Sequence, residues 1–190
     1  MAFGGEDERT VRNLLAAYEN EMNAHARYKA YAARADEESF FGVGSLFRAT
    51  ARAEQIHASN QARALRQSGA EARANVVPAK VAATLENLQE ALKGEKHEIE
   101  VLYPKFAEDA LAGINALATR AFTLAMEAEK THMELYTGAI AQIESGDVGS
   151  WVRVARDFHV CPMCAFTTDQ KVEGNCPVCG YPAERFETVA

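Results

Sequence analysis

Two segments of the chain place a glutamate and a histidine three residues apart: Glu54 with His57, and Glu129 with His132. Residues three apart on an α-helix lie on the same face, one turn along, so each pair can bind one metal ion. A single pair of this kind occurs by chance on many solvated helices. Because the pattern is repeated in a second helical region, it indicates a metal site shared by two helices.

Three further glutamates, Glu21, Glu95 and Glu98, lie in two other helical regions. One glutamate on each of two helices, with Glu-x-x-His on each of two others, is the ligand set of di-iron carboxylate four-helix bundles. Burying unpaired carboxylates is very costly, so five of them converging inside a bundle require cations there. We therefore predict a centre of two iron ions.

The composition is that of an ordinary globular protein, with 48% of the 190 residues hydrophobic and 25% charged. The net charge of −7 argues against nucleic acid or an anionic membrane surface as a partner. No run of about 18 apolar residues is present, so we expect no membrane span. The acidic amino-terminal segment lacks the apolar stretch of a secretion signal, and we expect a cytoplasmic protein.

Apolar residues recur at helical spacing in the four regions that must carry these ligands. We expect helices over about residues 7–38, 45–67, 84 onward and 115–143. Residues 40–44, which contain two glycines, are expected to form the first turn, and residues 69–83 a long crossover. Pro104 removes a helical hydrogen bond and should kink the third helix just beyond its glutamates.

All four cysteines lie in two C-x-x-C pairs, Cys161 with Cys164 and Cys176 with Cys179. In a chain without an export signal, this spacing indicates one tetrahedral four-thiolate metal site rather than disulfides. Iron and zinc satisfy the same ligands, so both stay open as the bound metal. Residues 151–154 and 186–189 are predicted to be short strands around this site.

These features predict an all-α four-helix bundle of the ferritin-like kind, followed by a small, β-poor metal-binding domain. We assign residues 1–145 to the bundle, residues 146–153 to a flexible linker and residues 154–190 to the four-cysteine domain.

The motifs together resemble those of rubrerythrins, in which a ferritin-like di-iron bundle precedes a rubredoxin-like domain. The resemblance covers nearly the whole chain, and the combination is far more specific than either half. It rests on the following motifs: the two Glu-x-x-His pairs, Glu21 through Arg27-Tyr28, Gly94-Glu95-x-x-Glu98, Leu102-Tyr103-Pro104 and the two cysteine pairs.

The resemblance implies a role for each residue of the di-iron centre. Glu54 and Glu129 would bridge the two irons. The terminal ligands would be Glu21, Glu95, Glu98, His57 and His132. One iron would exchange between Glu98 and His57 when its redox state changes, and Tyr28 and Tyr103 would hydrogen-bond to the carboxylates.

The chain departs from the family pattern at two positions. Ala165 follows the second cysteine of the first pair, where rubredoxin-like sites usually have glycine at positive φ. A positive φ costs alanine on the order of 1 kcal/mol. His25 is also unexpected beside Glu21, and we predict that it lies near the surface or behind the ligands rather than on a metal.

The implied function is a non-haem di-iron peroxidase that reduces hydrogen peroxide to water, in defence against oxidative stress. Electrons would come from a donor such as rubredoxin or an NADH-dependent reductase and would pass through a four-cysteine iron. A head-to-tail homodimer is also implied, in which the rubredoxin-like domain of one chain serves the di-iron centre of the other. The alternative is a ferroxidase or iron-handling bundle whose four-cysteine site holds a structural zinc.

Overall fold

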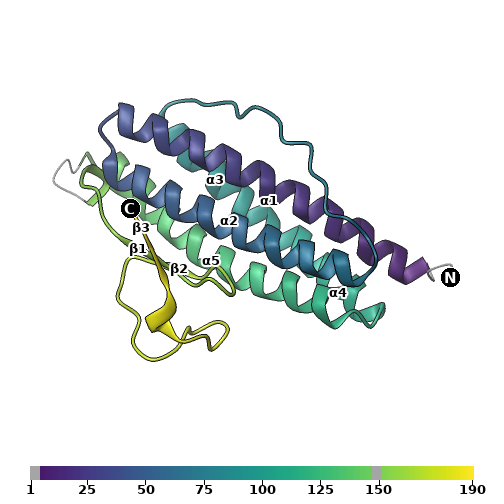
Figure 1. Ribbon diagram of the computed structural model, residues 1–190. Helices are drawn as coiled ribbons and strands as arrows, with labels where there is room; N and C mark the ends of the chain where they lie inside the picture. Colours follow the sequence, from purple (N-terminus) through teal and green to yellow (C-terminus); the bar gives the residue numbers. More distant parts are fainter. Residues whose placement is uncertain (1–4, 147–150) are drawn as a thin grey trace.

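Long helices make up most of the protein in a computed structural model that describes residues 5–146 and 151–190. The helical elements of the bundle are α1 (Gly5–Glu37), α2 (Phe41–Gln67), α3 (Thr84–His97), the π-helical turn η1 (Glu98–Leu102), α4 (Tyr103–Ala112) and α5 (Ala116–Glu144). Figure 1 shows that α1 and α2 form one hairpin, while α3 and α4 run on as one bent helix beside α5. The predicted four-helix bundle is confirmed, with η1 and α4 completing its third helix.

The buried face of α1 explains how a glutamate comes to lie in the core. Leu14, Ala17, Glu21, Ala24 and Tyr28 follow one another at alternating intervals of three and four residues, and all of them are buried. This spacing keeps side chains on one face of an α-helix. Glu21 therefore occupies a core position of the apolar stripe.

The first turn lies earlier than predicted. Residues 40–44 were expected to break the helix, but α2 begins at Phe41 and the turn is made by the preceding residues, with Ser39 at φ +61°. Gly42 and Gly44 are helical, and each allows a close approach: Gly42 faces the backbone carbonyl of Trp151, and Gly44 faces the carboxylate of Asp36. These glycines serve packing rather than chain reversal.

The predicted crossover is confirmed. After Gly69, which takes φ +73° at the end of α2, no helix or strand forms until α3 begins at Thr84. Two asparagines fasten this segment to the bundle: the Asn23 side chain accepts from the Val77 backbone N–H, and the Asn87 side chain pairs with both backbone groups of Ala82. Figure 1 shows the crossover running outside α1 along the length of the bundle.

The helix that carries Glu95 widens where a proline kink was expected. The backbone N–H of Tyr103 donates to the carbonyl of Glu98, five residues earlier, which defines a π turn. Pro104 follows in the first turn of α4, where its missing N–H leaves few intrahelical bonds unmade. The irregularity thus begins at Glu98 itself and not beyond it.

The carboxyl-terminal region contains three short strands, β1 (Phe158–Val160), β2 (Thr167–Thr168) and β3 (Glu187–Val189), besides two 3₁₀ turns, η2 (Trp151–Arg153) and η3 (Ala183–Arg185). They form an antiparallel sheet in the order β2-β1-β3. The strand predicted near the chain end is confirmed by β3. The strand predicted over residues 151–154 is wrong, because this segment coils as η2 while the Arg153 guanidinium lies 3.6 Å from the centre of the Phe40 ring.

The carboxyl-terminal region packs directly on the bundle. Val152, Phe158 and Val160 belong to one buried cluster together with Val43 and Phe47 of α2. The predicted linker falls partly on residues 147–150, which lie outside the described residues. Among the described helices, none has both the length and the apolar content needed to cross a membrane.

Candidate metal centres

The two Glu-x-x-His pairs meet in the middle of the bundle, one from α2 and one from α5. Their potential ligand atoms fall into two groups of four residues, and within each group these atoms all lie within 4.8 Å of one another. The first group is Glu21, Glu54, His57 and Glu129; the second is Glu54, Glu95, Glu129 and His132. Each group offers the oxygen and nitrogen donors that suit a first-row metal ion.

Glu54 and Glu129 belong to both groups. A carboxylate has two oxygens, so a residue common to two adjacent sites can give one oxygen to each metal. The arrangement has approximate two-fold symmetry, since each group adds one further glutamate and one histidine. This geometry would suit a two-metal site in which both shared carboxylates bridge.

Both histidines point the same nitrogen at the carboxylates. His57 Nδ1 lies 2.9 Å from Glu129 Oε1, and His132 Nδ1 lies 2.6 Å from Glu129 Oε2. On the other side of each ring, Nε2 donates to a backbone carbonyl: that of Cys164 at 3.3 Å for His57, and that of Ala165 at 3.4 Å for His132. A histidine whose Nε2 carries the proton leaves Nδ1 free to bind a metal, and such a partner fixes the ring orientation.

The cluster is rich in glutamates, but burial opposes the ionisation of most of them. It raises the pKa of Glu54 from 4.5 to about 8, and the neighbouring Glu95 charge adds to the effect. Burial also raises the pKa values of Glu21 and Glu129, in both cases helped by the charge of Glu54. The pKa of Glu95 is lowered instead, because its contacts with His132 and Glu129 and the hydrogen bond from the Tyr28 hydroxyl outweigh its burial.

The residues present fit a pair of metal ions. Glu21 Oε2, Glu54 Oε1 and Glu95 Oε2 are buried and have no hydrogen-bond partner. A buried carboxylate oxygen without a donor is destabilising. A dication beside these oxygens would satisfy them and would hold the carboxylates ionised, which is the state that their burial opposes.

Two tyrosines hold the outer carboxylates, as the resemblance implied. The hydroxyl of Tyr28 donates to Glu95 Oε1 at 2.7 Å, and the hydroxyl of Tyr103 donates to Glu21 Oε1. Burial raises the pKa of each phenol, so both stay protonated donors. Each of the two groups thus has one phenol behind its outer glutamate.

Gln61 was not predicted from the sequence. Its side-chain amide is buried and donates to Glu21 Oε1 at 3.0 Å, beside the Tyr103 hydroxyl. The signal was present, because Gln61 follows His57 by four residues and therefore shares its helix face. Gln61 and Tyr103 together orient Glu21.

Glu98 stands apart from the two groups. It is half-buried, and its carboxylate is not among the clustered ligand atoms. Burial raises its pKa, and so do the charges of Glu21 and Glu95. Its ligand role, expected from the resemblance, stays a prediction.

The remaining histidines lie away from the metal groups. His25 Nδ1 donates to the Ala51 carbonyl at 2.6 Å, which ties α1 to α2. His97 is exposed on α3, and His159 lies in β1 opposite Thr168 and Thr188. None of the three belongs to a metal group among the described residues.

The four cysteines form a third cluster, with all Sγ atoms within 4.8 Å of one another. The two loops have matching backbones: Ala165 N–H donates to the Cys161 carbonyl and Gly180 N–H to the Cys176 carbonyl, at φ +69° and φ +75°. The positive φ expected at Ala165 is therefore confirmed. A hydrogen bond from Cys164 lowers the pKa of Cys161 to about 5, so one thiolate is ready for a metal.

The first cysteine loop lies against the histidine side of the bundle. Asn60 of α2 donates to the Met163 carbonyl at 2.9 Å, and Thr167 Oγ1 lies 3.2 Å from His132 Nε2. At the sheet edge, Arg52 of α2 makes a bidentate pair with Glu187 at 2.6 and 2.8 Å. Residues that sequence spacing could not connect thus join the two centres.

Comparison with known proteins places these features together in one family. A sequence profile of the family Rubrerythrin matches residues 12–140. Rubrerythrin-2 of Clostridium acetobutylicum is 34% identical over 182 residues, covering 94% of this chain and 95% of that protein. Nigerythrin of Nitratidesulfovibrio vulgaris is 34% identical over 179 residues, covering 93% and 85%. A structure of nigerythrin in a mixed-valence state superposes with a TM-score of 0.84 at 31% identity, covering 99% of this chain and 88% of that one.

Proposed function

The chain belongs to the rubrerythrin family, and we propose that it is a non-haem di-iron peroxidase that reduces hydrogen peroxide to water. One observation carries the proposal: two metal groups share Glu54 and Glu129, and their histidines donate to the backbone of the four-cysteine loop. Iron storage requires the first feature but gives no reason for the second. The pairing favours a site that is supplied with electrons.

The proposed ligand roles follow the two groups. Glu54 and Glu129 would serve both metal ions, Glu21 and His57 would complete one metal position, and Glu95 and His132 would complete the other. The pKa of Glu98 is raised by burial and by the charge of Glu21, and we assign this residue as the ligand that would exchange with His57 on the first metal. Cys161, Cys164, Cys176 and Cys179 hold the third iron.

Reduction of one peroxide to two waters takes two electrons and two protons. Two bound ferrous ions supply one electron each when the site is loaded. The chain orients the ligands and excludes water. Tyr28 and Tyr103 hold the outer glutamates as neutral hydrogen-bond donors. The backbone carbonyls of Cys164 and Ala165 hold the two imidazoles. Glu54, whose pKa near 8 lets it carry a proton at neutral pH in the absence of metal, exchanges that proton for metal on loading.

The four-cysteine site is the proposed source of electrons for the next cycle. A short path to the bundle runs through the covalent bonds of Cys164, from its Sγ to its carbonyl, and then across one hydrogen bond to His57 Nε2. This path lies within one chain, whereas the head-to-tail homodimer implied by the resemblance would pass electrons between chains. If the path within one chain carries the electrons, turnover per chain should not change when a dimer is diluted into monomers.

The physiological setting is also proposed. An NADH-dependent reductase or a rubredoxin would deliver electrons singly to the four-cysteine site. Thiolate ligands of a metal site are protected from oxidation in a reducing compartment, which supports a cytoplasmic location and a role against oxidative stress.

Selective metal substitution tests the proposal against the iron-handling alternative. Protein with iron in the bundle and zinc in the four-cysteine site should, once reduced chemically, consume about one peroxide per di-iron site, as paired ferrous ions require. Supplied with NADH and a reductase, it should fail to cycle, whereas the all-iron protein continues. Equal steady-state rates would show that the four-cysteine site is structural, and the alternative would be favoured.

A further inference from the structure

The di-metal site is closed on most sides. Six of its seven ligand candidates are at most 1% exposed, and the histidine side is covered by the Cys164 and Ala165 carbonyls. One end of the site is filled by the rings of Tyr28, Phe47 and Tyr136, and the other by the rings of Tyr103 and Phe122. Of the seven candidates, only Glu98 is partly exposed. A small molecule therefore has most room to approach on the side of Glu98, between α1 and α3.

On that side, two helices face each other with matching spacing. Arg27 and Tyr31 lie four residues apart on α1, while Glu90, Gly94 and Glu98 follow at four-residue intervals on α3 and its continuation. Residues four apart share a helix face. In the row formed by Glu90, Gly94 and Glu98, which leads to the metal site, Gly94 is the position without a side chain.

Gly94 leaves a small gap beside the site. A Cβ placed on Gly94 would lie 3.9 Å from Arg27 Nη2 and 4.0 Å from the Tyr28 hydroxyl, with no other heavy atom outside its own helix closer. Tyr28 in turn donates to Glu95 of the second metal group. The gap therefore has a guanidinium on its outer side and a ligand-holding phenol on its inner side.

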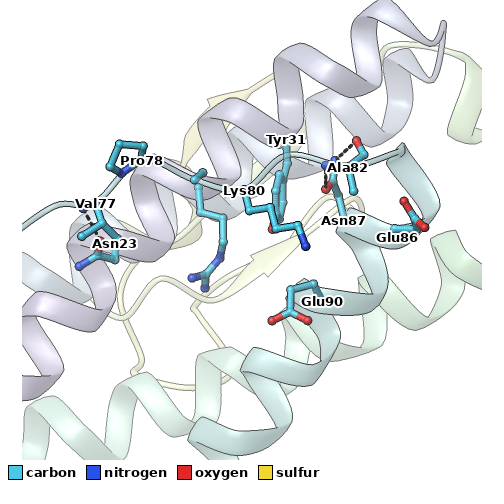
Figure 2. Close-up of a pocket in the computed structure, with 11 residues that line it drawn as sticks. Asn23, Tyr31, Val77, Pro78, Lys80, Ala82, Glu86, Asn87 and Glu90 are labelled. Carbon is cyan, nitrogen blue, oxygen red and sulfur yellow. Dashed lines mark hydrogen bonds between the residues drawn. The ribbon is translucent and has the colours of Figure 1, made fainter.

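Outside the gap lies a pocket of about 710 Å³. Figure 2 shows it between α1, the crossover and α3, with Tyr31, Lys80 and Glu90 around it. Arg27 also lines this pocket, and its Nε has no hydrogen-bond partner. The Arg27 side chain thus lies beside both the pocket and the gap, and its Nε does not fix it in place.

We propose that this pocket and the gap over Gly94 form the access route by which hydrogen peroxide reaches the di-metal site, with Arg27 as its gate. The substrate named here rests on the proposed function, but the route itself does not. Lys80 and Glu90 at the pocket offer hydrogen bonds to a small polar molecule, and the Gly94 gap admits it past Arg27 to Glu98. The water formed from peroxide would leave by the same route.

The test fills the gap with one methyl group. In Gly94→Ala the new Cβ sits at ordinary contact distance from Arg27 and Tyr28, so no atom must move. Alanine also favours the helix interior over glycine, so the variant should melt at a higher temperature than the wild type. Gly138→Ala is the matched control, because Gly138 is an exposed helical glycine of α5 with nothing within 4 Å of an added Cβ.

Azide, a small ligand of iron, reports on the route independently of peroxide. Stopped-flow absorbance of the iron-loaded full-length protein gives its association and dissociation rate constants. In Gly94→Ala both should fall together by about tenfold with the dissociation constant unchanged, because the filled gap no longer holds a water-sized molecule. Gly94→Val should slow both further, and Gly138→Ala should match the wild type.

The outcomes separate the route from the proposed function. Wild-type azide kinetics in Gly94→Ala would overturn the route, and so would a changed dissociation constant with an unchanged dissociation rate, which would mean that Gly94 shapes the site. The second-order rate constant of the pre-reduced protein with peroxide should fall by the same factor as azide association. If azide is slowed and peroxide is not, peroxide does not use this route. If the wild type fails to consume peroxide while azide is gated, the proposed function fails and the route stands.

Discussion

The two metal centres are built in opposite ways. The di-metal site takes its ligands from separate helices, and its clustered side chains are nearly inaccessible to solvent. The four-cysteine site is made by two loops, and Cys179 of the second loop is partly exposed. A centre that must exclude water from its chemistry gains from rigid burial, whereas a centre that receives electrons from another protein needs an open side. The Cys164 and Ala165 carbonyls join the closed centre to the open one.

The largest expected effect comes from removing a shared ligand. Glu129→Ala should weaken metal binding in the bundle by more than about 100-fold, beyond the loss typical of outer-sphere partners, because both groups use Glu129. Iron analysis should show an empty bundle and a filled four-cysteine site. Glu134→Ala, an exposed glutamate of the same helix, is the control.

The reciprocal change sharpens the contrast. Cys179→Ser should abolish the visible absorption of the ferric four-thiolate site and leave the iron content of the bundle intact. Iron lost from both centres in either variant would mean that the two do not fill independently.

A third prediction concerns the stability of protein whose bundle has been emptied of metal. The pKa of Glu54 is raised by burial from 4.5 to about 8 in the folded state. Between these pH values the folded state holds more protons than the unfolded state, so the free energy of unfolding falls as pH rises. The slope is about 1.4 kcal/mol per pH unit for each excess proton.

Thermal unfolding at several pH values checks this sign. The metal-free protein should melt at progressively lower temperature from pH 5 to pH 8, because the stabilisation is complete below the unfolded pKa and is lost through the folded one. Protein with metal in the bundle should show no such decline, since its carboxylates are already ionised. A metal-free melting temperature that rises over this interval would contradict the assigned direction.

A fourth prediction addresses the contact between the centres. Thr167→Val keeps the shape of the side chain but removes the hydroxyl that lies 3.2 Å from His132 Nε2. Metal affinity in the bundle should fall by about tenfold, the lower end of the range for such partners, because the Ala165 carbonyl still accepts from the ring. Titration with cobalt(II) measures the affinity, and Thr168→Val at the neighbouring position should leave it unchanged.

The smallest expected effect compares the two cysteine loops with each other. Gly180→Ala places a Cβ at φ +75° with no atom within 4 Å, so it should destabilise the protein by about 1–2 kcal/mol through backbone strain alone. Ala165→Gly relieves similar strain but removes a buried methyl worth about 0.8 kcal/mol and adds chain entropy, so its net effect should be under about 1 kcal/mol. Denaturant unfolding of the iron-loaded proteins distinguishes the two, and equal destabilisation by both swaps would contradict the account.

Much of the bundle could be predicted because its information is local. The interval of three residues in Glu54–His57 and Glu129–His132 places donors on one face whatever surrounds the helix. The spacing along α1 likewise assigns Glu21 to the core. Helix ends at Gly69 and Asn115 could be predicted for the same reason, since the cap is made by residues next to the end.

What could not be predicted depends on residues distant in sequence. Gly42 and Gly44 were taken for a turn, yet they are helical because Trp151 and Asp36 approach them. The strand expected at residues 151–154 is replaced by a 3₁₀ turn, in which the Arg153 guanidinium stacks on the Phe40 ring. The sequence around Thr167 gives no sign that this residue contacts His132, which lies 35 residues earlier in the chain.

The π turn between α3 and α4 has a consequence for the angular phase of that helix. Each residue of an α-helix turns the chain by about 100° and advances it by about 1.5 Å. If the same residues wound as a regular α-helix, everything beyond the turn would be rotated by about that angle. Glu95, upstream, would keep its place in the second metal group, while the Tyr103 hydroxyl would swing away from Glu21 of the first. The wide turn is thus a phase offset that lets one helix give a carboxylate to one metal position and a phenol to the other.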